Sequence, residues 1–378
     1  MKKNKFAFTL MELLAVIAII AILATVSIVY FDNAVQKKRD TQRTTDIAQI
    51  QNALEMYFRY ENRYPDSLSF GGTLVGSTTS ATTYLQTVPE NPSPRDDGGC
   101  ADSEYTYQAT DDGKNYQLAF CLGGASGVLN AGCNVADAMG IEADAPLCIS
   151  DLKLWLKSDS GVELNGNNVL TWADQSGNGN DAAQSTPANQ PLLVGDYQNG
   201  HAALEFNGTA SYLVGTTIAG LSTSSLSFFV VAAGDNSANA QGEMLFGVND
   251  YSNGLWINRY MGNQTFNILQ NSIYAAALQT TNNSLPNAGW TTKLLEHTKN
   301  LNTFANVYIN GAEINNVSGA SNQTAGFTNA NYYVGYNPFG YVDYFKGHIM
   351  EMIIYTRFLT DTERLQIENY LNSKYNIY

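Results

Sequence analysis

The 378-residue sequence predicts an α+β protein: a long N-terminal helix with a small β-sheet head, followed by a large all-β sandwich that ends in a short helix. Three observations support this prediction. An apolar run from Phe6 to Phe31 passes into an amphipathic pattern with helical spacing. After residue 150, short apolar runs alternate with turns rich in Gly and Asn, as in a β-sandwich. Helical spacing returns only near the C-terminus.

The charge balance is acidic. The chain has 20 Lys and Arg against 34 Asp and Glu, and its formal net charge is −14. Because an excess of acid repels a phosphate backbone, this balance argues against a nucleic-acid partner. Three histidines and four cysteines leave little for a multi-histidine metal centre or a zinc site. Asn, Ser, Thr, Gly and Tyr supply the polar surface instead, which suits an exported protein.

The cysteines predict two disulfides. They form an even set without a C-x-x-C motif, and in an exported chain such a set most simply pairs. The sequence leaves three connectivities open. The set consists of Cys100, Cys121, Cys133 and Cys148.

The N-terminal apolar run is long enough to cross a membrane. At about 1.5 Å per helical residue, the run from Phe6 to Phe31 exceeds a hydrocarbon core of about 30 Å. The lysines at positions 2, 3 and 5 favour a cytoplasmic N-terminus. A cleaved secretory leader has a shorter apolar stretch, of about 7 to 15 residues. A plain signal anchor leaves Glu12 unexplained, because an intramembrane carboxylate usually marks a partner.

Residues 5–14, KFAFTLMELL, resemble the class III leader of type IV pilins and pseudopilins, in which a short basic segment precedes Phe-Thr-Leu-x-Glu and an apolar helix. The resemblance implies that a prepilin peptidase cuts between Ala7 and Phe8 and that the new N-terminus is methylated. Residues 1–7 would then be the leader, and residues 8–31 would stay attached as a transmembrane and filament-core helix. Ala7 occupies a position where the family usually has Gly.

Cleavage would give Glu12 its partner. The cut creates an α-ammonium group at Phe8, and Glu12 of one subunit can neutralise that group on a neighbour when the helices pack into a filament. The implied partners are other pilin subunits, the prepilin peptidase and the inner-membrane assembly machinery. We expect the precursor in the bacterial cytoplasmic membrane, with its N-terminus in the cytoplasm, and the mature protein in a pilus at the cell surface.

Residues 32–125 predict the rest of the helix and the small head. The charged stretch from Lys37 to Arg43 is interpreted as a solvated surface near the lipid headgroups. Pro65 disfavours helical geometry in the preceding residue and so ends the helix. Residues 104–109 and 114–122 flank an Asp-Asp-Gly turn and predict a hairpin. One helix face is marked by Ile47, Ile50, Leu54, Tyr57 and Phe58.

Residues 126–150, rich in Gly and Ala, are interpreted as a disulfide-bearing linker, and residues 151–378 as one β-sandwich. Thr360 and Glu363 form a capping box that opens the short C-terminal helix. The predicted strands of the sandwich are residues 169–172, 202–206, 226–233, 243–248, 254–257, 304–309, 332–334 and 348–355.

Four motifs in this domain resemble the concanavalin A-like, laminin G-like jelly rolls. The resemblance implies the fold more than the function, because this fold carries lectins, adhesins, glycan-cleaving enzymes and spacers alike. The motifs are residues 154–157, 172–182, 203–208 and 345–355.

The sequence does not favour an enzyme, and we expect no catalytic residues. The β-glucanase members of the fold place Glu-x-Asp-x-x-Glu on one strand. This chain has no such motif: Glu351 stands alone among apolar residues, and His348 has no neighbouring Ser or Cys nucleophile. Binding is therefore the better prediction.

Two loops are candidate binding sites. Residues 336–344 crowd aromatic side chains and an acid between two predicted strands, as a sugar-stacking loop does, although half of them could fill the core instead. Residues 174–180 alternate oxygen-bearing side chains like the first half of a calcium loop. Because no bidentate Glu follows, a tight turn that binds its own backbone is the alternative. The candidate ligand-binding residues are Asn337, Phe339, Tyr341, Asp343 and Tyr344, and the candidate calcium residues are Asp174, Ser176, Asn178 and Asn180.

The sequence thus predicts a minor or tip subunit of a type IV pilus that displays a lectin-like module for adhesion or surface recognition, with a glycan or a surface protein as ligand. Two alternatives stay open. The chain could be a major structural pilin or a secretion-system pseudopilin, and in either the jelly roll would be architectural.

Overall fold

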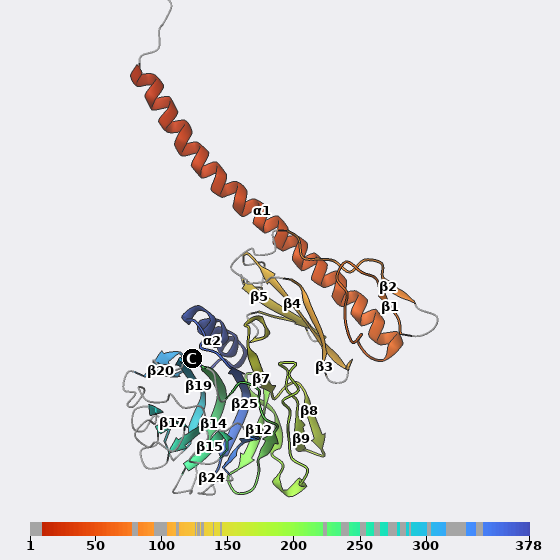
Figure 1. The fold of residues 1–378 in the computed structure, drawn as a ribbon, viewed down its shortest axis with the longest axis vertical. Helices are drawn as coiled ribbons and strands as arrows, with labels where there is room; N and C mark the ends of the chain where they lie inside the picture. The colour runs from red at the N-terminus through yellow and green to blue at the C-terminus, as the bar shows by residue number, and fades with distance from the viewer. Residues whose placement is uncertain are drawn as a thin grey trace, which may run out of the picture. The chain divides into compact units, whose positions relative to one another are not determined.

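A computed structural model shows two compact units, one of residues 1–109 and 115–143 (the N-terminal unit) and one of residues 110–114 and 144–378 (the C-terminal unit) (Figure 1). The structure describes residues 10–77, 82–93, 104–110, 113–124, 126, 129, 132–138, 140–143, 146–221, 225–235, 242–249, 255–260, 265–270, 278–279, 285–286, 289–300, 304–314, 330–337 and 343–378.

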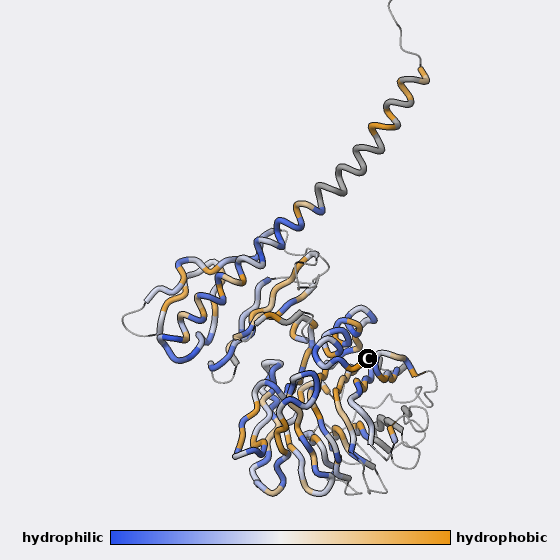
Figure 2. Tube along the Cα trace, turned by 180° about the vertical axis from the view of Figure 1, so that it is seen from behind, coloured by the Kyte–Doolittle hydropathy of each residue, from blue (hydrophilic) through white to orange (hydrophobic). Residues whose placement is uncertain are grey.

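A long helix, α1 (Leu10–Glu61), opens the N-terminal unit. Apolar residues predominate where it begins, and hydrophilic residues predominate in its middle (Figure 2). Asn62 ends the helix in the left-handed conformation (φ 58°), and its N–H donates to the Phe58 carbonyl. No helix in the described part of the chain combines the length and apolarity that a membrane span requires.

Two small sheets complete this unit. One pairs β1 (Leu74–Val75) with β2 (Thr83–Leu85). The other has the order β3-β4-β5-β6, with β3 at Thr106–Thr110, β4 at Asn115–Leu122, β5 at Gly132–Asp137 and β6 at Gly140–Ala143. The predicted apolar face of α1 is confirmed, because Ile47, Ile50, Leu54 and Tyr57 are at most 5% exposed in a core shared with β4.

The linker prediction is wrong for much of residues 126–150. Strands β5 and β6 lie in this segment and extend the sheet by pairing antiparallel with β4 and with each other. The composition was misleading because Gly and Ala are typical of linkers, whereas Val135 and Ala136 are buried in the sheet.

The cysteine predictions are tested only in part. Cys121 on β4 and Cys133 on β5 occupy opposite positions in the register. Both are disulfide-bonded, and no cysteine in the described part of the chain is free. Cys100 lies outside the described residues, as does the side chain of Cys148. Which cysteines pair with which therefore stays a prediction.

The charged stretch on α1 is not a solvated surface throughout. Asp40 is 3% exposed and Arg43 is 0% exposed. The Arg43 guanidinium donates to Asp40 Oδ1 (2.9 Å), Asn91 Oδ1 (2.8 Å) and the Pro92 carbonyl (3.4 Å). Asp40 in turn accepts the backbone N–H groups of residues 123 and 124 at 2.8 and 2.9 Å. The pair therefore fastens two loops to the helix.

The C-terminal unit is a jelly-roll β-sandwich (Figure 1). Strand β25 pairs with β14 along one side, and with β12 and β7 along the other. The main strands are β7 (Leu152–Lys157), β8 (Val162–Asn165), β9 (Asn168–Trp172), β10 (Ala182–Ala183), β11 (Leu192–Gln198), β12 (His201–Asn207), β13 (Leu213–Gly215), β14 (Leu226–Gly234), β15 (Gly242–Val248), β16 (Leu255–Tyr260), β17 (Thr265–Gln270), β18 (Leu278–Gln279), β19 (Trp290–Asn300), β20 (Phe304–Ile309), β21 (Ala312–Glu313), β22 (Tyr332–Val334) and β25 (Lys346–Tyr355).

The eight strands predicted for the sandwich are confirmed as β9, β12, β14, β15, β16, β20, β22 and β25, with ends that differ by at most two or three residues. Strand β19 was missed, although it lies between β14 and β20. Its Thr, Lys, Glu and His side chains interrupt the apolar alternation by which a strand is recognised in a sequence. Glu296, His297 and Thr298 are nevertheless buried, because other elements surround the strand.

The chain ends in α2 (Asp361–Tyr375). The predicted capping box is confirmed: the Thr360 side chain accepts from the Glu363 N–H, and the Glu363 carboxylate accepts from the Thr360 N–H. Ile367, Glu368, Tyr370, Leu371 and Tyr375 are buried on the face of α2 that packs onto the sandwich.

Candidate functional site

Four tyrosines gather where β23 (Tyr336–Asn337) pairs with β24 (Asp343–Tyr344). The Tyr336 and Tyr344 rings stack with centroids 4.5 Å apart and planes 18° apart. The Tyr212 ring lies 4.8 Å from that of Tyr336, and the Tyr333 ring lies 6.2 Å from it. We call these four residues the tyrosine cluster. All four are half-buried, so part of each ring reaches the surface.

Two phenols of the tyrosine cluster, Tyr333 and Tyr336, are less acidic than an exposed tyrosine. Burial raises the pKa of Tyr333 and of Tyr336, and the neighbouring Tyr344 raises that of Tyr336 further. The cluster offers aromatic faces and phenolic hydroxyl groups, which suits an uncharged polar ligand with an apolar face.

The loop residues predicted to bind a ligand lie in different environments or outside the described residues. Tyr344 belongs to the tyrosine cluster, but Asn337 is only 1% exposed, so its side chain does not reach solvent. Phe339 and Tyr341 lie outside the described residues, as does the side chain of Asp343. The sequence did not indicate Tyr212, because it lies more than a hundred positions before β23.

The predicted calcium loop is a hydrogen-bonded turn. Asp174 Oδ1 accepts the N–H groups of Trp155 and Ser176, both at 2.9 Å. Its Oδ2 accepts the Ser176 hydroxyl (2.7 Å) and the Asn180 N–H (3.0 Å). The side-chain amides of Asn178 and Asn180 donate to the backbone carbonyls of residues 152 and 153. These groups hold their own backbone, as the alternative interpretation expected.

Metal ligation has no further support in the described part of the chain, where no three His, Cys, Asp or Glu residues come together as a metal site. Burial raises the pKa of Asp174, and hydrogen bonds from Trp155, Ser176 and Asn180 lower it in part. Because both oxygens of Asp174 already accept two hydrogen bonds each, the loop is better explained as a brace for the start of β7.

Glu351 on β25 is the centre of a second polar cluster, which the sequence did not predict. Its Oε1 accepts from Trp155 Nε1 (2.5 Å) and the Tyr370 hydroxyl (2.8 Å). Its Oε2 accepts from Lys374 Nζ (2.9 Å) and the Tyr375 hydroxyl (2.8 Å). Glu351 is 1% exposed. Three side chains of α2 thus donate to this one carboxylate. The Glu351 carboxylate, which has only apolar neighbours in the sequence, therefore accepts four hydrogen bonds in the fold.

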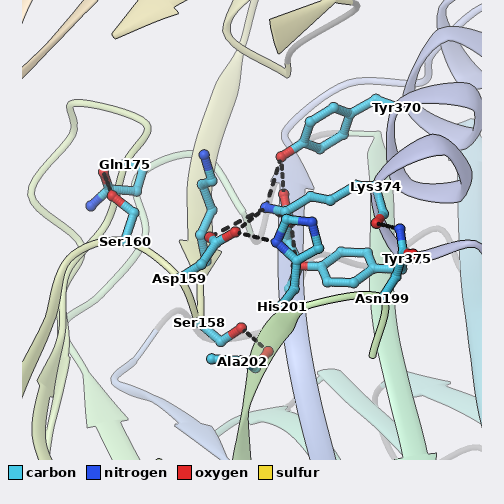
Figure 3. Close-up of polar contacts among 12 residues, drawn as sticks. Ser158, Asp159, Ser160, Gln175, Asn199, His201, Ala202, Tyr370, Lys374 and Tyr375 are labelled. Atoms are coloured by element: carbon cyan, nitrogen blue, oxygen red, sulfur yellow. Dashed lines mark hydrogen bonds and ion pairs between the residues drawn. The ribbon is translucent and has the colours of Figure 1, made fainter. Parts of the chain in front are cut away.

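The Lys374 amine also reaches Asp159, which lies just after β7. Nζ is 3.0 Å from Asp159 Oδ2, and His201 Nδ1 is 2.9 Å from the same oxygen (Figure 3). Asp159 and His201 are about a quarter to a third exposed, so this side of the cluster opens to solvent. One sequence signal for it existed: Tyr370 and Lys374 are four positions apart and share a helix face.

A further buried carboxylate, Glu296 on β19, also faces α2. Burial raises its pKa to about 8, and the Arg364 guanidinium, 3.8 Å away, lowers it in part. Arg364 also lies over the Tyr308 ring, 4.1 Å from its centroid, and pairs with Glu368. Charged groups beneath α2 thus fix the helix at two places.

Two family models match the chain. Residues 2–28 match the prokaryotic N-terminal methylation motif, and residues 207–363 match the concanavalin A-like lectin/glucanases superfamily. A comparison with curated proteins finds no match.

Solved structures with similar folds share little sequence with this chain. Trypanosoma rangeli sialidase in complex with sialic acid aligns at 13% identity and a TM-score of 0.43, covering 72% of this chain and 45% of that one. The binding domain of botulinum neurotoxin DC in complex with SialylT aligns at 14% identity and a TM-score of 0.43, covering 59% of this chain and 52% of that one. Domain 4 of AbnA, an arabinanase from Geobacillus stearothermophilus, in complex with arabinotriose, aligns at 20% identity and a TM-score of 0.40. The alignment covers 58% of this chain and 98% of that one.

The chain therefore spans about half of the sialidase and neurotoxin chains, and these likenesses carry no inference about activity. The methylation-motif match covers the leader recognised in the sequence, and the superfamily match begins near the end of the third sandwich motif and contains the fourth, residues 345–355. This chain thus begins with an N-terminal methylation motif of the prepilin type and carries a concanavalin A-like, laminin G-like domain in its C-terminal unit.

Proposed function

We propose that this protein is a type IV pilin-like subunit, minor or at the tip, that displays its lectin-like sandwich outside the cell for adhesion or surface recognition. The observation that carries the proposal is the presence in one chain of a methylation motif at residues 2–28 and a concanavalin A-like domain at residues 207–363. The motif supports export and assembly, and the domain supports recognition.

The start of α1 supports assembly. Its apolar side chains are 57 to 83% exposed in the single chain, and a row of this kind needs a cover. In the proposed life cycle, the cover is the cytoplasmic membrane before cleavage and neighbouring subunits afterwards. The row consists of Leu10, Met11, Leu13, Leu14, Ile17, Ile19 and Ile20.

Processing and charge pairing give the first prediction. Mass spectrometry of the mature protein should find a methylated Phe8 at the N-terminus. Glu12→Ala should leave membrane insertion intact but reduce the protein in sheared filaments at least tenfold, because the buried ammonium of a neighbour loses its partner. The matched control is Glu313→Ala, which removes an exposed carboxylate and should assemble normally. Normal assembly of the Glu12→Ala variant would refute the pairing.

The tyrosine cluster is the proposed ligand surface, and the proposed ligand is a glycan. A pyranose ring offers an apolar face to an aromatic side chain and hydroxyls to its rim. Two roles can explain why four half-buried tyrosines meet here: they pack against one another, or they recognise a ligand. A surface protein is the other class of ligand that this surface could accept.

Binding to a glycan array gives the second prediction. Tyr336→Ala and Tyr344→Ala should each weaken binding of the full chain by about fivefold or more, because a central ring commonly contributes more than about 1 kcal/mol. The control is Tyr60→Ala, which removes a tyrosine that is 81% exposed on α1. Unchanged binding of both cluster variants would place the ligand elsewhere.

We propose recognition without catalysis. Glu351 is the carboxylate that the sequence analysis weighed against the catalytic motif of the β-glucanases. It is buried and accepts four hydrogen bonds, so it is not presented to a substrate. Abundance in filaments and a requirement in secretion distinguish the two structural alternatives from this proposal. A major pilin would dominate sheared filaments, and a secretion pseudopilin would be needed for export of other proteins.

A further inference from the structure

The contact between Lys374 and Asp159 joins the beginning and the end of the C-terminal unit. Asp159 follows β7, the first strand of the sandwich, and Lys374 lies in the last turn of α2. Nζ of Lys374 is 3.0 Å from Oδ2 and 3.3 Å from Oδ1 of Asp159. Because Nζ contacts both oxygens, Cγ of Asp159 lies between the two contacts, next to the nitrogen that would attack it.

A second carboxylate adjoins the same amine on its buried side. Oε2 of Glu351 is 2.9 Å from Nζ, and the side chains of Glu351 and Lys374 are 0% and 6% exposed. The rings of Tyr370 and Tyr375 lie 5.7 and 5.1 Å from Nζ (Figure 3). Burial disfavours an ammonium ion relative to the neutral amine, whereas the two adjacent carboxylates favour the ammonium.

From this arrangement we propose that Lys374 and Asp159 condense into an intramolecular isopeptide bond, with Glu351 as the group that transfers the proton. The neutral ε-amine attacks Cγ of the protonated Asp159 side chain. As the N–C bond forms, the Glu351 carboxylate accepts a proton from the nitrogen and then delivers it to the departing hydroxyl. The C–O bond breaks and one water leaves. The step has no change in oxidation state and needs no co-reactant.

The surroundings of Asp159 define the starting state. Burial alone would raise the pKa of its carboxyl, but the charges of Lys374 and Lys157 and the hydrogen bonds from Lys374 and His201 lower it. The two groups therefore begin as an ion pair, and a proton passes from Nζ to the carboxylate along their 3.0 Å contact before the attack. The side chain of Asp159 is 25% exposed, which gives the released water a path to solvent.

The bond would close a covalent ring from residue 159 to residue 374, which contains every strand from β8 to β25. It would hold α2, the terminal element, where fraying of a domain commonly begins. A cross-link of this kind resists unfolding because it restricts the denatured chain. The proposal does not depend on pilus assembly, because the covalent structure of the chain alone decides it.

The test is peptide mapping of the purified full-length chain after its disulfides are reduced and alkylated. We expect a branched product that joins the peptide containing Asp159 to the peptide containing Lys374 and is lighter by one water than the two together. Fragmentation should place the link at these two side chains. If the folded protein yields only the two separate linear peptides, the proposal is wrong.

Substitutions identify the three roles. Lys374→Arg should abolish the link, whereas the control Lys153→Arg, at a half-buried lysine on β7, should leave it intact. Glu351→Gln should slow its formation by about a hundredfold or more. Asp159→Asn should lose ammonia instead of water and give a linked product of the same mass as the native one. A link that persists in Lys374→Arg, or that forms at the native rate in Glu351→Gln, would contradict the assigned roles.

Discussion

Glu351→Ala should destabilise the C-terminal unit by about 3 to 5 kcal/mol, because several buried donors lose their acceptor at about 1 to 3 kcal/mol each. The substitution takes the acceptor from the Lys374 nitrogen, from the Trp155 indole and from two tyrosine hydroxyls. Because a domain is typically stable by about 5 to 15 kcal/mol, the variant would lose a large share of its stability.

The measurement is denaturant unfolding followed by tryptophan fluorescence. All four tryptophans lie in the C-terminal unit, and one of them, Trp155, bonds to Glu351 directly. Glu313→Ala is the control, because this exposed carboxylate should change the stability by no more than about 0.5 kcal/mol. Equal stability of the two variants would show that the Glu351 cluster contributes nothing net to the docking of α2.

Arg43→Ala should destabilise the N-terminal unit by a similar amount, about 3 to 5 kcal/mol. The guanidinium is fully buried and connects Asp40 on the same helix with Asn91 and the Pro92 carbonyl. Without it, Asp40 keeps its two backbone donors but loses the guanidinium with which it forms a buried ion pair. Arg43→Lys should recover part of the loss, because an ammonium group cannot reproduce the planar fork of three contacts.

Hydrogen exchange of the amides in α1 and β4 measures this effect, and tryptophan fluorescence reports the C-terminal unit in the same sample. We expect faster exchange in the N-terminal unit and an unchanged fluorescence transition. Lys38→Ala, at an exposed position of the same helix, is the matched control. Native-like exchange in Arg43→Ala would mean that the loops at residues 91–92 and 123–124 are held by other contacts.

Arg43 also shows where sequence interpretation could have gone further. Asp40 and Arg43 continue the apolar stripe of Ile47, Ile50 and Leu54 at the same alternating spacing of three and four residues. Composition alone predicts a surface position for them, because charged side chains are seldom fully buried. The spacing placed them on the buried face, and pairing with each other and with the loops made their burial tolerable.

Local pattern did determine several elements. The alternation of apolar residues predicted β12, β14 and β25, and the capping box predicted where α2 begins. These features depend on residues only a few positions apart, so the local sequence is sufficient to determine them. The methylation motif and the motifs of the sandwich were recognisable for the same reason, since each is a short run of residues.

Only the tertiary structure decided which distant side chains meet. Glu351 bonds to Trp155 across 196 positions, and Lys374 reaches Asp159 across 215. The tyrosine cluster likewise joins Tyr212 to the β23–β24 pair. Such contacts depend on the register of β25 against β7 and on the docking of α2, and both are set by the packing of the whole core. Local periodicity specifies which face of an element is buried, but it does not specify what that face will touch.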